Sequence, residues 1–196
     1  MSISSNRMKR RDQLILLCTF VGFSWLAMQV VHELGHVIGA VLSGGKVTQV
    51  VLLPWTFSRT DVNPSPHPLA VAWAGPVLGA LLPLCILLFA RTLRAPGLYL
   101  FRFFAGFCLI ANGEYIGIGS LQGLADAGDM LRYGSPQWSL IAFGLLTVPP
   151  GLYMWNRLGP HFGFGEAKGS VSRPAAMGSL ALLLALAGLE IVLGRR

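Results

Sequence analysis

The segment "VHELGHVIGA", from Val31 to Ala40, decides what kind of protein this chain can be. It places His32, Glu33 and His36 inside an otherwise apolar stretch that runs from Leu14 to Ser43. That stretch is longer than the ~20 apolar residues that a helix needs to cross the hydrocarbon core of a bilayer. Ionisable groups are costly at membrane depth and usually mark a functional interior site. We therefore expect this segment to be a transmembrane helix that carries the functional centre.

The rest of the chain is also typical of a membrane protein. Only 12% of the residues are charged, whereas an ordinary soluble domain has about 25%. Four more segments are apolar enough to span a bilayer, namely Pro68–Ala90, Leu98–Leu124, Gln137–Trp155 and Ala175–Leu193. The sequence therefore predicts an all-α integral membrane protein with about five transmembrane helices, within a range of four to six.

The connections between these spans suggest three parts. A basic N-terminal segment covers residues 1–13, and a membrane core of three spans covers residues 14–132. Two further transmembrane helices lie in residues 133–196, joined by a Gly-rich linker at 159–174 that we expect to be mobile and on the surface. Val, Thr and aromatic residues in Lys46–Phe57 favour a short extended β segment after the first span, although Pro54 argues against a long uninterrupted strand.

The net charge of +7 predicts membrane orientation rather than nucleic-acid binding. The basic residues flank the spans or lie in short loops, as the positive-inside rule describes. Ten of the 15 Lys and Arg fall on the side of the N-terminus, and the five on the other side include Arg195 and Arg196. We expect a multi-pass protein of a bacterial cytoplasmic (inner) membrane, with its N-terminus in the cytoplasm. The lipid bilayer is then a partner and nucleic acid is not.

The residues of HELGH have the spacing of a metal site. On a helix, His32 and His36 lie one turn apart and face the same way. Two imidazoles in this arrangement can bind one Zn²⁺, and Glu33 beside them can take a proton from metal-bound water. A divalent cation would also offset the cost of keeping the Glu33 carboxylate ionised in the membrane.

A hydrolytic zinc site needs a third protein ligand and keeps one position open for water. Asp126 and Asp129 lie just past the third span, and Glu114 lies within it. Carboxylates near membrane depth are favoured, because surface Asp and His residues need no special explanation. The less favoured candidates, in loops and in the linker, are Asp61, His67 and His161.

Three motifs occur in a defined order along the chain: "HELGH" (His32–His36), "AGPVLGA" (Ala74–Ala80) and "DAG" (Asp126–Gly128). In this respect the chain resembles the site-2 protease family of intramembrane zinc metalloproteases. That family carries its HExxH motif in an apolar helix, a small-Gly-Pro motif in the next core helix, and an aspartate followed by small residues at the third. The resemblance covers roughly Leu14 to Arg132.

The resemblance implies a role for each matching residue. His32, His36 and an aspartate would ligate zinc, while Glu33 would activate water. Asp126 is the best match for the aspartate because Ala127 and Gly128 follow it, and Asp129 is the alternative. The family motif more often reads Asn-Pro followed by Asp-Gly. Gly75 and Pro76, from the small-Gly-Pro motif, are expected to support the site.

Two further polar residues, Asn112 and Glu114, interrupt the apolar third span. Polar groups at this depth usually face the interior of a bundle. Asn112 could hydrogen-bond substrate or an inner backbone carbonyl, and Glu114 could contact a ligating histidine. A polar contact between helices is the alternative for both. The family also places a strand region after its first core helix, so Lys46–Leu53 is a candidate for pairing with an extended substrate, the alternative being an interfacial loop.

Together these features favour an intramembrane zinc endopeptidase. It would hydrolyse a peptide bond of a transmembrane or membrane-adjacent protein substrate, with Zn²⁺ as its cofactor. The alternative is a non-proteolytic membrane scaffold or chaperone that retains a metal site. A metal or proton transporter is less favoured, because its polar residues should be spread across the bilayer, whereas here they cluster in the first and third spans.

Overall fold

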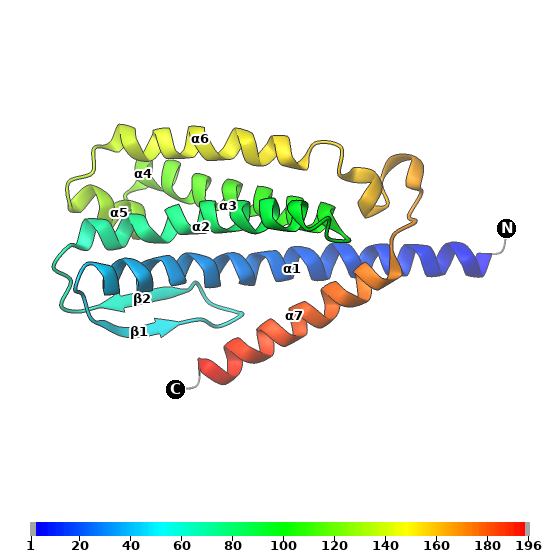
Figure 1. The fold of residues 1–196 in the computed structure, drawn as a ribbon, viewed down its shortest axis with the longest axis horizontal. Helices are drawn as coiled ribbons and strands as arrows, with labels where there is room; N and C mark the ends of the chain where they lie inside the picture. The colour runs from blue at the N-terminus through cyan, green and yellow to red at the C-terminus, as the bar shows by residue number, and fades with distance from the viewer. Residues whose placement is uncertain (1–2, 195–196) are drawn as a thin grey trace.

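The computed structural model describes residues 3–194, so Arg195 and Arg196 lie outside the described residues. Five of its helices are long and apolar enough to cross a membrane, and they run roughly alongside one another (Figure 1). They are α1 (Ile3–Leu42), α2 (Pro68–Thr92), α3 (Leu98–Gly117), α6 (Gln137–Trp155) and α7 (Arg173–Leu193). The five predicted spans are confirmed, and the chain is an integral multi-pass membrane protein.

The helices pack in the order α7, α1, α2, α3 and α6, with α7 diverging from the bundle toward its C-terminal end (Figure 1). Small residues allow the closest approach, as is common between helices in lipid. A Cβ atom on Gly35 of α1 would overlap the backbone of Ala74 in α2. One on Gly117 of α3 would lie 3.2 Å from the Cα atom of Gly144 in α6. The HELGH helix is therefore held directly against the backbone of α2.

The extended segment predicted after the first span contains the first strand of an antiparallel hairpin. Its strands, β1 (Val47–Val51) and β2 (Arg59–Val62), pair with each other and lie along the C-terminal half of α1 (Figure 1). β1 is shorter than the predicted segment because the chain turns between the two strands, where Pro54 lies. Gln29 of α1 accepts a hydrogen bond from the backbone N–H of Ser58 at 3.0 Å, which attaches the hairpin to the helix.

After α3 the chain folds back toward α2 through two short helices, α4 (Gly119–Gln122) and α5 (Ala125–Arg132). Gly123 makes the turn between them possible, because its φ of 62° is in the left-handed region that glycine adopts readily. Ala127 and Met130 of α5 are fully buried in a hydrophobic cluster with Ile116 and Leu140. This burial fixes which face of α5 points into the bundle.

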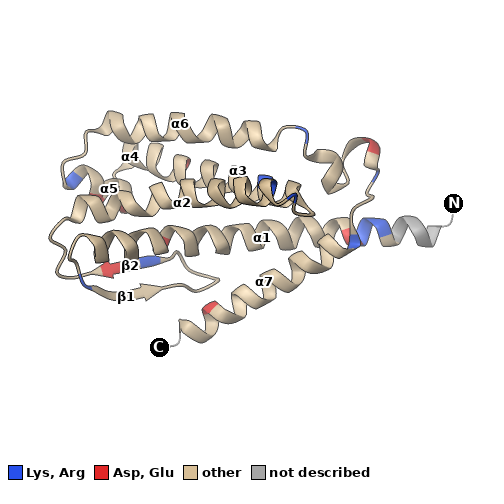
Figure 2. Cartoon of the chain, in the orientation of Figure 1, with Lys and Arg blue, Asp and Glu red and all other residues tan. Residues whose placement is uncertain are grey.

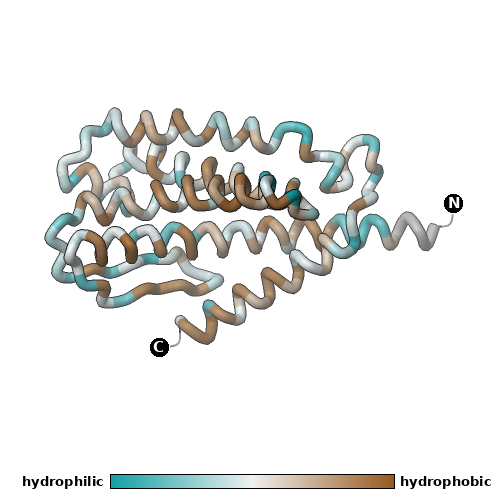
Figure 3. Tube along the Cα trace, viewed as in Figure 1, coloured by the Kyte–Doolittle hydropathy of each residue, from teal (hydrophilic) through white to brown (hydrophobic). Residues whose placement is uncertain are grey.

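The Gly-rich linker at 159–174 differs from the mobile surface segment that the sequence predicts. It contains two short 3-10 helices, η1 (Gly159–Phe162) and η2 (Gly165–Ala167). Phe162 is buried in a cluster with Leu16 and Phe20 of α1, and its backbone carbonyl accepts a hydrogen bond from the Gln13 side chain at 3.0 Å. One buried aromatic side chain therefore holds this otherwise hydrophilic loop (Figure 3) against the bundle.

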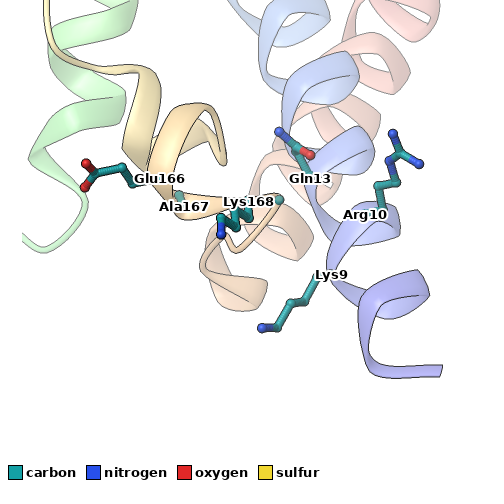
Figure 4. A pocket seen from close by; sticks show the side chains of 7 residues that line it. Lys9, Arg10, Gln13, Glu166, Ala167 and Lys168 are labelled. Carbon is teal, nitrogen blue, oxygen red and sulfur yellow. The ribbon is translucent and has the colours of Figure 1, made fainter. Parts of the chain in front are cut away.

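Lys and Arg residues gather at the end of the bundle where α1 begins (Figure 2). An open pocket lies there between α1 and the linker, with Lys9 and Lys168 among its lining residues (Figure 4). The HELGH segment lies about 20 residues further along α1, a distance of roughly 30 Å on a helix. This basic pocket is therefore separate from the histidine cluster.

Candidate metal centre

His32, Glu33 and His36 are buried inside the bundle, each no more than 6% exposed. The helical repeat of α1 places the two histidine rings on one side, with their centroids 4.8 Å apart. Their Nε2 atoms lie 3.0 Å from each other. The expected local geometry of an HExxH motif is therefore present in α1.

Asp126 of α5 completes a cluster of three donor atoms. Its Oδ2 atom lies 2.8 Å from the Nε2 atom of His32 and 3.2 Å from that of His36. The three residues form a group of side chains that could hold a metal ion. Asp126 is 90 residues or more from the two histidines in sequence. The chain reverses direction before α5, which brings Asp126 next to His32 and His36.

The second ring nitrogen of each histidine, Nδ1, lies next to an oxygen atom. The Nδ1 atom of His32 lies 2.7 Å from Oδ1 of Asn112, and that of His36 lies 2.8 Å from the carbonyl oxygen of Val71. Asn112 presents its oxygen because its amide nitrogen donates to the carbonyl of Cys108 at 2.8 Å. Both Nδ1 atoms are thus placed to donate, which leaves the Nε2 lone pairs pointing into the cluster.

This donor set fits a zinc ion. Two Nε2 lone pairs and a carboxylate oxygen repel one another at 2.8–3.2 Å unless a proton or a cation lies between them. Ligands of a tetrahedral zinc, at about 2.0–2.1 Å from the metal, are roughly 3.3 Å apart. The observed triangle is slightly smaller than this. The side chain of Asp126 is 24% exposed, so the cluster is partly accessible on that side.

Asp126 is held in its ionised form. Burial raises the pKa of this carboxyl, but its close contacts with the imidazoles of His32 and His36 outweigh that effect and lower the pKa well below its ordinary value. Its position depends on the small residues that follow it. Ala127 is fully buried, and a Cβ atom on Gly128 would overlap the carbonyl of Gly123. The DAG motif thus allows the tight turn that brings Asp126 to the histidines.

The glycines of the AGPVLGA segment let α2 approach the cluster. A Cβ atom on Gly75 would overlap the imidazole of His36, and one on Gly79 would lie 2.5 Å from Oδ1 of Asn112. Pro76 is fully buried beside them. The motif therefore provides space for the side chains that form the site.

Glu33 lies next to the cluster and has a partner on the hairpin. Its Oε2 atom accepts a hydrogen bond from the hydroxyl of Thr60 in β2 at 2.6 Å. Because Glu33 is only 3% exposed, this contact offsets part of the cost of burying a carboxylate. The hairpin is thus connected to the residue that the sequence assigns as general base.

This geometry can be compared with known proteins. A family model described as Peptidase M50B-like matches residues 14–113, just over half of the 196-residue chain. The chain belongs to this family. The resemblance to site-2 proteases is thereby confirmed, and membership of the M50B-like family supports a metallopeptidase. The match includes HELGH, AGPVLGA and Asn112, and it ends before Asp126. No curated protein and no solved structure matches the chain.

The other candidate ligands lie elsewhere in this M50B-like protein. Asp129 is 48% exposed and forms an ion pair with Arg132 at 3.4 Å. Asp61 pairs with Arg59 on the exposed hairpin. His67 precedes the first residue of α2, and His161 stacks on the ring of Tyr99. The structure brings none of these four side chains into the His32–His36–Asp126 cluster, within the part of the chain that it describes.

Of the two polar residues of the third span, only Asn112 lies at the cluster. Glu114, proposed to contact a ligating histidine, is exposed on α3 and lies outside the cluster. Asn112 makes that contact instead, and it also bonds the inner backbone carbonyl that the sequence suggested. The reason is helical geometry, since residues two apart on a helix point about 200° apart. Only one of the two could face α1.

Sequence reasoning missed three features of this M50B-like site. They are the Thr60 hydroxyl on Glu33, the Val71 carbonyl on His36, and the Tyr115 ring, which packs edge-on against His32 with centroids 5.8 Å apart. A backbone carbonyl has no sequence signal. Thr60 lies in a short polar segment, "RTDV", which forms β2 but which the sequence did not predict as a strand. Tyr115 follows Asn112 by three positions, a spacing that places both near one face of α3.

Proposed function

We propose that this protein is an intramembrane zinc metalloprotease that hydrolyses a peptide bond of a membrane-embedded or membrane-adjacent protein substrate. The observation that carries the proposal is the convergence of two imidazole lone pairs and a carboxylate on one point, beside a buried glutamate in a transmembrane helix. Membership of the M50B-like family supports the same activity. Two imidazoles and a carboxylate are a suitable donor set for a divalent metal such as zinc.

His32, His36 and Asp126 would hold the zinc, while Asn112 and the Val71 carbonyl keep both rings in the tautomer that exposes Nε2. Zinc, when bound, supplies Lewis-acid polarisation of the scissile carbonyl and lowers the pKa of a water molecule. Glu33 would accept one proton from the water whose oxygen attacks the carbonyl carbon. It then delivers the proton to the leaving nitrogen as the C–N bond breaks.

The hairpin offers a place for an extended substrate. Each strand of a two-stranded sheet has one free edge, and most β1 residues are exposed. An extended peptide that adds to such an edge gains backbone hydrogen bonds. Hydrolysis requires an unwound peptide, and the hairpin lies beside the Glu33-bearing half of α1 (Figure 1). We assign the candidate segment Lys46–Leu53 to substrate alignment.

Reconstituted protein tests the proposed activity. Liposomes containing the full chain are mixed with single-span reporters whose apolar segments carry a Gly-, Asn- or Pro-containing break at different depths. Cleavage of at least one reporter is expected, with loss of activity after treatment with 1,10-phenanthroline and recovery on adding zinc. The non-chelating isomer 1,7-phenanthroline is the control. Metal-independent cleavage, or no cleavage of any reporter by zinc-loaded protein, would refute the proposal.

The orientation in the membrane is a separate proposal. We place the N-terminus in the cytoplasm of a bacterial cell, because Lys and Arg residues gather at the end of the bundle where α1 begins (Figure 2). A cysteine introduced at Ser170, in the linker at that end, should react with an impermeant maleimide only after the inner membrane is opened. A cysteine at Gly45 should react without that step. The reverse pattern would invert the topology.

A further inference from the structure

The Thr60 hydroxyl contacts Glu33 across 27 residues of sequence and joins β2 to α1. The 2.6 Å distance between its Oγ1 atom and Oε2 of Glu33 is typical of a hydroxyl that donates to an ionised carboxylate. Among the described residues, Thr60 is the hydrogen-bond partner of the Glu33 side chain. One carboxylate oxygen is thus engaged by the hairpin, and Oε1 is left to receive a proton.

A second contact fixes the hairpin in register with α1. Gln29, one turn before Glu33, accepts from the backbone N–H of Ser58, two residues before Thr60. Four residues rise about 6 Å along a helix, and two residues extend about 6.6–6.8 Å along a strand. Because these spacings match, both hydrogen bonds form at once and β2 is aligned along the helix. The position of the Thr60 hydroxyl is therefore set by the hairpin as a whole.

We infer that Thr60 is a positioning residue for the general base. Its hydrogen bond selects one orientation of the Glu33 carboxylate, as Asn112 selects one orientation of the His32 ring. A base must lie within hydrogen-bond reach of the proton that it abstracts, so a fixed carboxylate favours the proton transfer. This inference rests on the proposed function. It adds that the hairpin acts on the chemical step itself.

The test replaces Thr60 by Val, which keeps the size and the strand preference of the side chain but removes the donor. In zinc-loaded full-length protein, acting on the reporter that the wild type cleaves best, we expect kcat to fall at least about tenfold. KM should stay within about twofold, since the substrate contacts are unchanged. Bound zinc per chain should match the wild type. Thr60→Ser, which restores the hydroxyl, should recover kcat.

A spectroscopic readout reports the contact without relying on activity. The Glu33 carboxylate band is isolated as the infrared difference between a protein and its Glu33→Gln counterpart. In Thr60→Val, the antisymmetric stretch should move to higher wavenumber, because its hydrogen bond is lost. Thr92→Val serves as the matched control. Its hydroxyl bonds the Phe89 carbonyl at the exposed end of α2, so both kcat and the band should be unchanged.

Wild-type kcat together with an unshifted band in Thr60→Val would overturn the inference, as would a Thr60→Ser protein as impaired as Thr60→Val. An increase in kcat would also overturn it, because the hairpin would then restrain the base. Failure of the proposed function has a different signature. In that case Glu33→Gln matches the wild type or the wild type cleaves no reporter, while the infrared comparison still reads the Thr60–Glu33 contact.

Discussion

Glu33→Gln should abolish cleavage while leaving zinc in place. The amide keeps the size of the side chain and can still accept the hydrogen bond from Thr60, so the fold and the three donor residues should be preserved. It cannot take a proton from water. General-base catalysis contributes about 10²–10⁴-fold to a rate, and we expect kcat to fall by at least about 100-fold with unchanged zinc content.

The matched control for this variant is Glu114→Gln, which alters another glutamate of the membrane spans. Glu114 is exposed on α3 and lies outside the cluster, so cleavage should remain at the wild-type rate. A Glu33→Gln protein that cleaves reporters as fast as the wild type contradicts the mechanism. If that protein also retains its zinc and its full biological function, the chain is a metal-stabilised scaffold instead.

Asp126→Asn should weaken zinc binding more than the loss of any residue that only supports a ligand. The change replaces the anionic oxygen of the cluster by a neutral amide with nearly the same shape. Loss of an outer-shell partner typically costs 10–100-fold in metal affinity or activity, so we expect zinc affinity to fall by at least about 100-fold. Cleavage should fall with it. Competition with a fluorescent zinc chelator measures the affinity directly.

Asp129→Asn is the control in the same helix. Its carboxylate forms an exposed ion pair with Arg132, and such pairs contribute about 0–1 kcal/mol to stability. Zinc affinity should therefore remain near the wild-type value. The opposite result, in which Asp129→Asn loses zinc and Asp126→Asn retains it, would assign the third ligand to Asp129 and require a different rotation of α5.

Most of the fold could be predicted from local features of the sequence. Apolar segments of about 20 residues predict membrane helices, because lipid leaves the backbone few other ways to satisfy its hydrogen bonds. The first strand of the hairpin follows from the Val- and Thr-rich composition of its segment, whereas the second strand, β2, was not predicted. The packed linker could not be predicted in this way. It depends on contacts between Phe162 and residues of α1, Leu16 and Phe20, that lie more than 140 positions earlier in the chain.

The candidate site also has a part that the sequence predicts locally and a part that depends on tertiary packing. His32, Glu33 and His36 share one helix, so their spacing alone predicts their geometry. Asn112 and Asp126 reach the histidines through tertiary contacts 80 and 94 residues apart in sequence. Composition could not choose between Asn112 and Glu114, because the rotation of α3 decides which of them faces α1. That rotation is set by helix packing, and no local signal reports it.

The most direct test of the account is the zinc content and zinc-edge X-ray absorption spectrum of the purified wild-type protein, beside Asp126→Asn. We expect about one zinc per wild-type chain. Two imidazole nitrogens and oxygen ligands should surround the zinc at about 2.0–2.2 Å. In Asp126→Asn the metal should be lost or its shell should change. A wild-type protein that binds no zinc under conditions in which it is folded, or binds it without imidazole ligands, would contradict the central claim.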